Sequence, residues 1–236
     1  MIYIENIREN IESIRKRIAD AAKRAGRDAD EIKLIAVTKT VDVDKVEEAI
    51  AADALDAGEN KPQELARKYE VLGDKIRWHQ IGSLQTNKVK YIIDKVCMIH
   101  SLDREGLAEE IDKRANKIGR VIDCLVQVNI SGEESKHGMS REEVEPFVRL
   151  VAEKYPNIKI KGLMTMAPFD AERDEIKKVF RDLKELSDEI NNMNIGNVEM
   201  KELSMGMTND FEIAVEEGAT MVRVGTAIFG KRNYNK

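Results

Sequence analysis

The sequence predicts an α/β protein built as a single (β/α)8 barrel. Apolar, strand-like runs alternate with segments of helical periodicity, which is typical of a parallel sheet with helical crossovers. An open doubly wound sheet would also fit this alternation. The count of eight apolar runs and the length of 236 residues favour the closed barrel. Because little chain follows the eighth run, we expect one domain over residues 1–236.

The first element is an amphipathic helix that precedes the barrel. Ile7, Ile11, Ile14 and Ile18 recur at helical spacing, and Gly26 follows them as a stop signal. Strands are then predicted near residues 33–38, 54–57, 76–81, 96–101, 121–128, 158–165, 200–204 and 220–224. Between them, helical patterns run over residues 43–50, 107–118, 144–151 and 176–186.

Composition argues against several classes of function. The net charge of -5 gives no overall basic field, so we expect no nucleic-acid partner. Cys97 and Cys124 form no CxxC pair, which predicts buried thiols in a reducing compartment. The histidines share no metal-ligand spacing, so no metal is expected. With no signal-like N-terminus and no apolar run of membrane-spanning length, we expect a cytoplasmic protein without a membrane partner.

Functional side chains in such a barrel lie at the carboxyl ends of the strands. The ends of strands seven and eight are rich in glycine and hydroxyl residues, namely Ser204, Gly206 and Thr208, then Gly225 and Thr226. Segments of this kind expose backbone N–H groups that bind anions, and barrels often hold a phosphate at these two strands. Either segment alone would be explained by helix capping and turns. Together, on adjacent strands, they favour a phosphate site.

Lys39 ends the apolar run "KLIAVTKT", and its charge there requires an explanation. One interpretation is a rim lysine that pairs with a carboxylate or extends to water. The other is an inward-pointing, poorly solvated amine that attacks a carbonyl to form a Schiff base. Combined with a phosphate site, the second interpretation describes pyridoxal phosphate, and equally a phosphorylated sugar in an aldolase.

Arg223 lies within the eighth predicted strand, where an unpaired charge is costly. A buried salt bridge with Glu199 or Glu202 would satisfy it. Alternatively, its guanidinium contacts the ring nitrogen of a cofactor and, being always protonated, keeps that nitrogen unprotonated. His79, near the end of the third predicted strand, is interpreted as a structural hydrogen-bonding residue.

Several segments, in this order, resemble the YggS/PROSC family of pyridoxal phosphate homeostasis proteins: "AVTKT", "GEN..QE", "WHQIGSLQTNK", "VQVNIS.E.SKHG", "GLMTM" and "LSMGMTNDFE.A...GATMVRVGTAIFG". The resemblance extends from about residue 30 to the C-terminus. It implies a barrel like the N-terminal domain of alanine racemase that binds pyridoxal 5'-phosphate (PLP). The chain departs from the family at "AGENKPQE", where the family commonly reads "FGENYVQE".

The resemblance also implies roles for individual residues. Lys39 matches the Schiff-base lysine, and Arg223 matches the arginine that faces the pyridine nitrogen. The other matched positions are an asparagine and a methionine beside the cofactor, three residues of the phosphate cradle and a lysine linked to secondary cofactor handling: Asn60, Met164, Ser204, Gly225, Thr226 and Lys136.

The same barrel in a racemase resembles part of a two-domain dimer, and the sequence after Thr226 offers no counterpart of the second domain. We therefore expect no second acid or base and little or no catalysis beyond the covalent lysine, Lys39. The expected function is PLP homeostasis, with carriage of the cofactor to apo-enzymes by a monomer. Two alternatives remain: a PLP-dependent, racemase-like enzyme acting on amino acids, and a class I aldolase-like Schiff-base enzyme.

Overall fold

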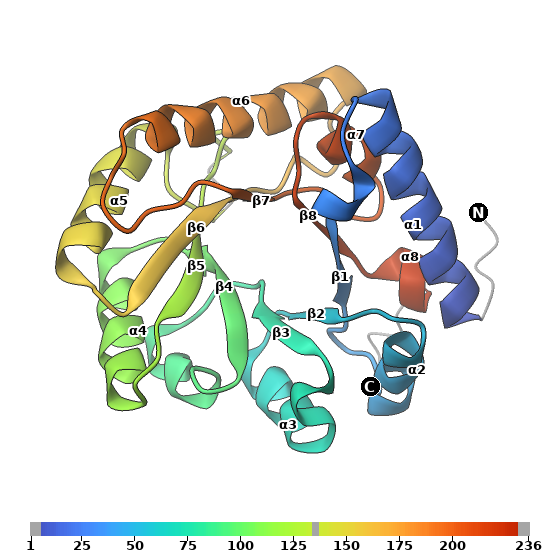
Figure 1. Cartoon of the computed structure of the whole chain (residues 1–236), viewed down its shortest axis with the longest axis horizontal. Coiled ribbons are helices and arrows are strands. Elements are labelled where there is room, and N and C mark those ends of the chain that lie inside the picture. Colours follow the sequence, from blue (N-terminus) through green and yellow to red (C-terminus); the bar gives the residue numbers. More distant parts are fainter. Residues whose placement is uncertain (1–5, 134–136, 231–236) are drawn as a thin grey trace.

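Eight parallel strands close into a barrel. In a computed structural model of the chain, which describes residues 6–133 and 137–230, the strands pair in the order β1 to β8, and β8 pairs with β1 (Figure 1). They are β1 (Lys33–Val37), β2 (Asp56–Glu59), β3 (Arg77–Gln80), β4 (Val96–Leu102), β5 (Ile122–Gln127), β6 (Ile158–Met164), β7 (Glu202–Ser204) and β8 (Met221–Val224). The predicted fold class is confirmed, and every predicted run overlaps a strand.

Helices surround the barrel (Figure 1). They are α1 (Ile7–Arg24), α2 (Val43–Ala51), α3 (Pro62–Leu72), α4 (Glu105–Lys117), α5 (Arg141–Lys154), α6 (Arg173–Asn192), α7 (Phe211–Glu216) and α8 (Thr226–Phe229). The expectation of a helix after every strand is met at β3 only by a 3-10 helix, Thr86–Tyr91. Val89 is the one buried residue of that segment, and a longer amphipathic helix would need a full apolar stripe.

Local sequence explains why α1 forms. The side-chain oxygen of Asn6 accepts hydrogen bonds from the N–H groups of Arg8 and Glu9, which caps the first turn. The four isoleucines predicted to share one face are all buried. The helix stops before Gly26, whose φ of 66° favours glycine. Helix α1 packs against α2, α7 and α8 and covers the side of the barrel where α7 and α8 are short (Figure 1).

The strands are apolar on both faces because the barrel interior and the helix layer both exclude water. Ala36 of β1 faces outward and packs beneath the helices. Ile35 faces inward and joins a buried layer from four other strands, made of Met98, Leu125, Met164 and Met221. This layer fills the barrel, so only the residues at the two ends of the strands meet solvent or a ligand.

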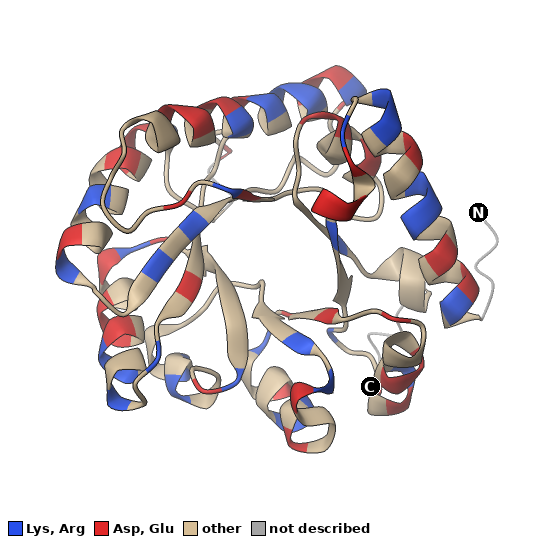
Figure 2. Cartoon of the chain, in the orientation of Figure 1, with Lys and Arg blue, Asp and Glu red and all other residues tan. Residues whose placement is uncertain are grey.

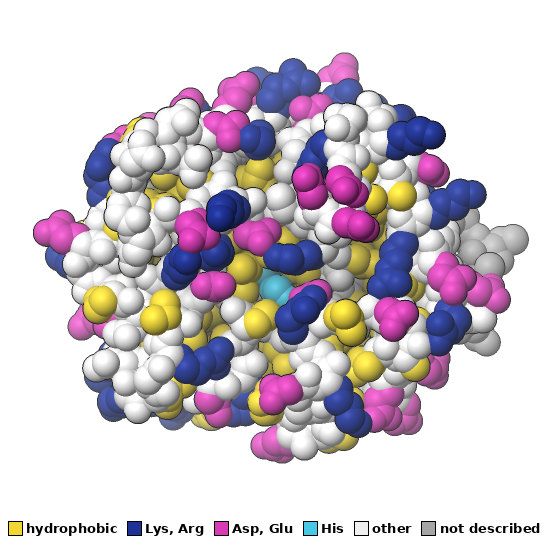
Figure 3. Space-filling model, viewed as in Figure 1, with side chains coloured by type: hydrophobic (Ala, Val, Ile, Leu, Met, Phe, Trp, Pro, Cys, Tyr) yellow, Lys and Arg dark blue, Asp and Glu magenta, His cyan; other side chains and the backbone are white. Residues whose placement is uncertain are grey.

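Charged side chains gather where the strands begin. Lys159 and Lys161 of β6 each lie 2.6 Å from a carboxylate oxygen of Glu199. Lys33 of β1 pairs with Glu202 at 2.7 Å. Figure 2 shows the basic residues on β6, and Figure 3 shows acidic and basic side chains around the middle of one face, with a histidine between them. Because these charges are paired, the N-terminal end of the barrel serves stability rather than ligand binding.

Within residues 6–133 and 137–230, no helix is long and apolar enough to cross a membrane. The same residues contain no group of three or more His, Cys, Asp or Glu side chains that could hold a metal ion. Both cysteines are free thiols, and burial raises the pKa of Cys124 well above its ordinary value. Cys124 therefore behaves as a small apolar side chain.

Candidate functional site

The sheet register brings together the residues predicted on β6, β7 and β8. Met164, the last residue of β6, pairs with Ser204, the last residue of β7. Ser204 in turn pairs with Met221 of β8. Beyond the end of β7, the carbonyl of Gly206 accepts a hydrogen bond from the Arg223 N–H at 3.0 Å. Met164, Ser204, Gly206 and Arg223 are therefore neighbours across three adjacent strands.

Lys39 lies next to this group, because β1 pairs with β8. The strand ends at Val37, one residue before the end of the predicted run at 38, and Thr40, with a φ of 59°, turns the chain. Val37 pairs with Gly58 of β2, so Lys39 and Asn60, each two residues further along, lie at the same level. No hydrogen bond or ion pair joins the Lys39 amine to any residue that the structure describes. The carboxylate-paired interpretation is therefore not observed there.

Arg223 is a buried cation whose contacts are with neutral oxygen atoms. Its side chain lies inside the barrel, where Nη1 donates to Ser204 Oγ at 2.6 Å and Nη2 donates to the Thr165 carbonyl at 2.9 Å. The salt bridge considered from the sequence is not formed, because Glu199 and Glu202 pair with lysines. Burial lowers the pKa of Arg223 to about 10. The guanidinium thus stays charged at neutral pH and favours an anion or strong acceptor beside it.

A chain of hydrogen bonds crosses the barrel and ends at Ser204. Arg77 donates to Asp56 through Nε at 2.8 Å and Nη2 at 2.6 Å. His79 Nε2 lies 2.9 Å from Asp56 Oδ1, and His79 Nδ1 lies 2.9 Å from His100 Nε2. His100 Nδ1 lies 2.9 Å from Ser204 Oγ. These contacts agree with the interpretation of His79 as a structural hydrogen-bonding residue.

The two histidines differ in protonation. Burial acts to lower the pKa of His79, but hydrogen bonds to the Asp56 carboxylate and the Cys97 sulfur outweigh it and raise the pKa to about 9. Burial and the charge of His79 hold the pKa of His100 well below its ordinary value. At neutral pH, His79 is therefore cationic and donates through both ring nitrogens. His100 is neutral, accepts at Nε2 and carries its proton on Nδ1.

This arrangement of protons determines what the Ser204 hydroxyl can do. Its oxygen accepts hydrogen bonds from His100 Nδ1–H and from Arg223 Nη1–H. A hydroxyl has two acceptor positions and one proton, so only the proton remains available. Among residues 6–133 and 137–230, no acceptor for that proton is found. Ser204 therefore offers a donor next to a buried cation, and the pair is suited to an anionic or strongly accepting ligand group.

The backbone after β7 and β8 allows another group to approach it closely. Gly206 has a φ of 88°, and a Cβ there would lie 2.5 Å from the Cβ of Ala214, so only glycine fits. Gly225 and Thr226 start α8, in which the Ile228 amide bonds to the Gly225 carbonyl at 2.9 Å. The N–H groups of Thr226 and Ala227, the first two residues of that helix, have no helical acceptor. Both segments can therefore present backbone N–H groups, as the predicted phosphate cradle requires.

Sequence reasoning missed Asp56, His100 and Thr165. A signal for His100 exists, because it stands near the end of a predicted apolar strand as Lys39 does. Asp56 is recognised only when the register places it beside β3, and Thr165 contributes a backbone carbonyl that no sequence pattern marks. Lys136, to which the resemblance assigned secondary cofactor handling, lies outside the described residues.

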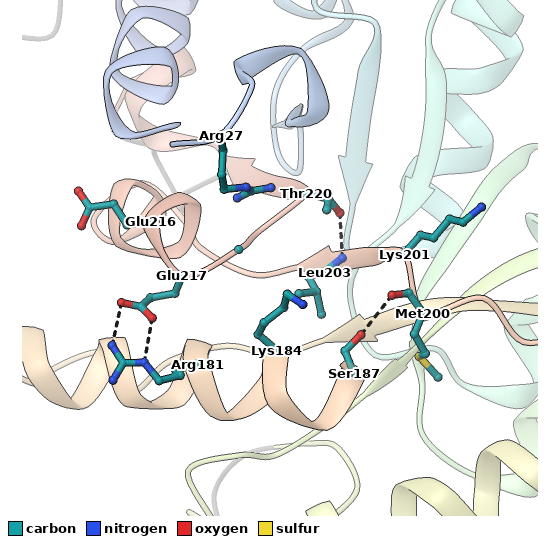
Figure 4. A pocket seen from close by; sticks show the side chains of 11 residues that line it. Arg27, Arg181, Lys184, Ser187, Met200, Lys201, Leu203, Glu216, Glu217 and Thr220 are labelled. Atoms are coloured by element: carbon teal, nitrogen blue, oxygen red, sulfur yellow. Dashed lines mark hydrogen bonds and ion pairs between the residues drawn. The ribbon is translucent and has the colours of Figure 1, made fainter. Parts of the chain in front are cut away.

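A separate hollow of about 370 Å³ lies between α6, β7 and α7 (Figure 4). It contains none of the predicted site residues. Its cations are already occupied: Arg181 donates to Glu217 at 3.2 and 3.3 Å, and Arg27 donates to the carbonyls of Val215 and Ala219. The hollow therefore lacks the free hydroxyl donor of Ser204 and a buried cation like Arg223, which is hydrogen-bonded only to neutral oxygen atoms, so the strand ends are the better candidate site.

The His79 pKa makes a testable prediction about stability. The folded-state pKa of about 9 lies above the ordinary value of about 6.5, so the stabilisation is complete below pH 6.5 and disappears as the pH rises through 9. His100 is neutral in the folded protein, and above about pH 7.5 it is also almost wholly neutral in the unfolded chain, so it adds little slope there. We expect the free energy of unfolding to fall by up to about 1.4 kcal/mol per pH unit between pH 7 and 8.5.

Urea titrations of the wild-type protein and the His79→Gln variant across this range measure the effect. The variant should show a shallower pH slope, and the difference in slope isolates His79 from the cysteines that also titrate in the unfolded chain above about pH 8.5. Equal slopes in the two proteins would show that His79 is not held as a cation.

Comparison with known proteins gives the same class of barrel. The sequence matches the alanine racemase N-terminal domain family over residues 2–233. It is 45% identical over 230 residues to the pyridoxal phosphate homeostasis protein of Aquifex aeolicus, covering 97% of this chain and 100% of that protein. The protein of the same name in Escherichia coli K12 is 34% identical over 237 residues, covering 99% and 100%.

Comparison with solved structures gives the same class of barrel. PipY of Synechococcus elongatus with PLP bound has a TM-score of 0.80 and 32% identity, covering 90% of this chain and 100% of that one. Alanine racemase of Corynebacterium glutamicum has a TM-score of 0.67 at 17% identity, with 95% of this chain and 62% of that one covered, and shares the fold. The fold and its strand-end site define a barrel of the alanine racemase N-terminal type. Within that class, the chain belongs to the YggS/PROSC family of pyridoxal phosphate homeostasis proteins.

Proposed function

We propose that this chain binds PLP at the carboxyl ends of its strands, as a Schiff base on Lys39, and maintains the cofactor by holding it and passing it to apo-enzymes. The observation that carries this proposal is the buried Arg223–Ser204 pair, which combines a cation whose hydrogen-bond partners are neutral oxygen atoms with a hydroxyl donor. The name of the Aquifex relative and the PLP-bound form of PipY support it.

The residues present fit the chemical groups of the cofactor. The Ser204 hydroxyl and the backbone N–H groups would hold the phosphate, and Arg223 would donate to the pyridine nitrogen and keep it unprotonated. The Lys39 amine would attack the aldehyde carbon, forming a C=N bond with loss of water. When bound, the cofactor supplies an electron sink. The remaining contacts are proposed for Asn60, Met164, Gly206, Gly225 and Thr226.

We propose that catalysis is weak or absent. A racemase or decarboxylase needs a free acid or base beside the substrate. Three buried titratable groups near the strand ends already have hydrogen-bond partners: His100 bonds to His79 and Ser204, Glu59 Oε1 accepts from Lys68, and Asp210 Oδ1 accepts from the Met207 N–H. The names of the curated relatives, which describe homeostasis, support a carrier. A cytoplasmic monomer is proposed, and sedimentation would test the oligomeric state.

The proposed carriage is tested by a transfer experiment. The PLP-loaded protein is mixed with an apo PLP-dependent enzyme while a phosphatase destroys free cofactor. Recovery of enzyme activity with the loaded protein, but not with the same amount of free PLP, is the expected result. Recovery that is equal in both arms would mean that the protein merely releases PLP.

The same preparation distinguishes a carrier from an enzyme. Incubation with D- and L-amino acids is expected to give no sustained racemisation or decarboxylation. Sustained turnover that disappears in Lys39→Ala would establish a PLP enzyme. A sugar phosphate trapped on Lys39 by borohydride would instead indicate an aldolase-like reaction.

A further inference from the structure

Lys68 of α3 is a buried cation next to the predicted cofactor lysine. Its side chain is 0% exposed. The ammonium donates to Glu59 Oε1 at 2.6 Å, to the Thr38 carbonyl at 2.6 Å and to Glu64 Oε1 at 2.9 Å. Each of the three N–H groups of the Lys68 ammonium thus has one oxygen acceptor. Desolvating an ammonium and a carboxylate costs several kcal/mol for each ion, and an apolar pair of similar volume often stabilises a fold equally well. Stability alone therefore does not explain the arrangement.

The cluster ties together three elements at the level of Lys39. Thr38 directly follows β1, Glu59 is the last residue of β2, and Lys68 lies in the second half of α3. The Thr38 hydroxyl also donates to Glu59 Oε1 at 2.7 Å. One ammonium therefore holds the end of β1 against its neighbouring strand and helix.

A second, independent observation lies on the other side of Lys39. Thr40 is β-branched, yet its φ is 59°, a left-handed conformation that is strained for a residue other than glycine. Its N–H donates to Glu64 Oε1 at 2.7 Å, the same oxygen that accepts from Lys68. Strained backbone of this kind persists only where the surroundings fix it, and it is concentrated at functional sites.

The two observations meet at the Lys39 turn. The Thr38 carbonyl accepts from Lys68 and also from the Val41 N–H, at 2.9 Å. Glu64 holds the Thr40 N–H. Both neighbours of Lys39 are therefore fixed by a network centred on one ammonium, whereas the Lys39 side chain itself has no partner among the described residues. The direction of the free amine is set by the backbone that carries it.

We propose that Lys68 is a positioning residue for Lys39: it fixes Thr38 directly, and Thr40 through Glu64, and thereby aims the Lys39 amine at its carbonyl ligand. The inference rests on the proposed attachment of PLP to Lys39. Because an amine must approach a carbonyl carbon along a narrow range of directions, a displacement of about 1 Å slows such a reaction by about 100-fold. An apolar residue at position 68 would preserve packing but not this constraint.

The informative variant is the double replacement Lys68→Met with Glu59→Gln. Lys68→Met alone leaves the Glu59 carboxylate buried without a cation, a strongly destabilising change that obscures any positioning effect. The double variant removes both charges, keeps similar volumes, and retains a side-chain oxygen to accept from Thr38. Lys184→Met is the matched control, because Lys184 also pairs with a carboxylate four residues away but is 43% exposed.

Two measurements are made on each protein. Amide hydrogen exchange without cofactor reports whether the Thr40 and Val41 N–H groups remain protected. Stopped-flow absorbance, with borohydride trapping and peptide mapping, gives the rate at which PLP becomes attached to Lys39. In the double variant, we expect exchange at these two amides to be at least tenfold faster and attachment at least tenfold slower, with a melting temperature close to that of the wild type. Lys184→Met should match the wild type throughout.

The possible outcomes separate positioning from simple stabilisation. An unchanged attachment rate in a folded double variant would overturn the inference, even if exchange were faster. A slower rate accompanied by general loss of protection across the barrel would also overturn it, because Lys68 would then be a structural residue. If wild-type protein carried no label on Lys39, the proposed function would fail, and the exchange experiment would still decide whether Lys68 holds the turn.

Discussion

Replacing Lys39 with alanine is expected to abolish covalent attachment of PLP while leaving the fold intact. The contacts proposed for Arg223 and Ser204 remain, so we expect weaker, non-covalent binding rather than none. The dissociation constant should rise by about 100-fold or more, which corresponds to about 2.7 kcal/mol. Because the Lys39 side chain has no partner among the described residues, the melting temperature should change by no more than about 2 °C.

The visible absorption spectrum and equilibrium dialysis measure these two effects. Lys61→Ala is the matched control, because Lys61 is an exposed lysine that immediately follows Asn60 at the same end of the barrel. That variant should retain the spectrum and the affinity of the wild type. If Lys39→Ala kept a borohydride-stable label, the attachment site would lie on another residue.

The Asp56→Asn variant is expected to be strongly destabilised. Burial alone would raise the pKa of Asp56, but hydrogen bonds from Arg77 and His79 outweigh it and lower the pKa. The asparagine would remove the carboxylate that stabilises the buried His79 cation, so folding must either leave this cation unpaired or deprotonate it, at a cost of up to about 3–5 kcal/mol. For a chain of this length, the melting temperature should fall by roughly 10 °C.

A functional effect should accompany this destabilisation. Without Asp56, His79 no longer favours the cationic form, and the proton on His100 Nδ1 that points Ser204 toward a ligand is no longer specified. We therefore expect weaker PLP binding in Asp56→Asn even at temperatures where the variant is fully folded. Differential scanning calorimetry and PLP titration test the two parts.

Asp94→Asn is the control for that variant, because Asp94 pairs with Lys95 at 2.8 Å and is 54% exposed. Loss of this surface ion pair should lower the free energy of unfolding by less than about 0.5 kcal/mol. Equal melting temperatures for the Asp56 and Asp94 variants would show that the interior network contributes no more than a surface ion pair.

The sequence predicted the barrel well because strand and helix periods differ and both are visible locally. The inward-facing Ile35 and the outward-facing Ala36 are apolar for different reasons, yet they belong to one recognisable buried run. The exact end of β1 was less predictable. It depends on Thr40, whose left-handed backbone is held by Glu64, a residue twenty-four positions away.

The sequence indicated candidate residues whose type and position alone suggest chemistry, and it missed residues whose role depends on their contacts. Lys39 and Arg223 were recognisable because a charge inside an apolar strand is unusual. The direction in which Ser204 donates was not recognisable, because it follows from the donor and acceptor roles of His79 and His100, which lie in a different part of the sheet. The burial of Lys68 was also not recognisable from the sequence, because a lysine on an amphipathic helix is ordinarily assigned to the solvent-exposed face.

The most direct test of the central claim is to load the purified wild-type protein with PLP, reduce it with borohydride and map the modified peptide. The expected result is a visible absorption band before reduction and a single phosphopyridoxyl group on Lys39 afterwards. A protein that stays colourless and unmodified, or a label on any other lysine, would contradict the claim that this barrel holds PLP through Lys39.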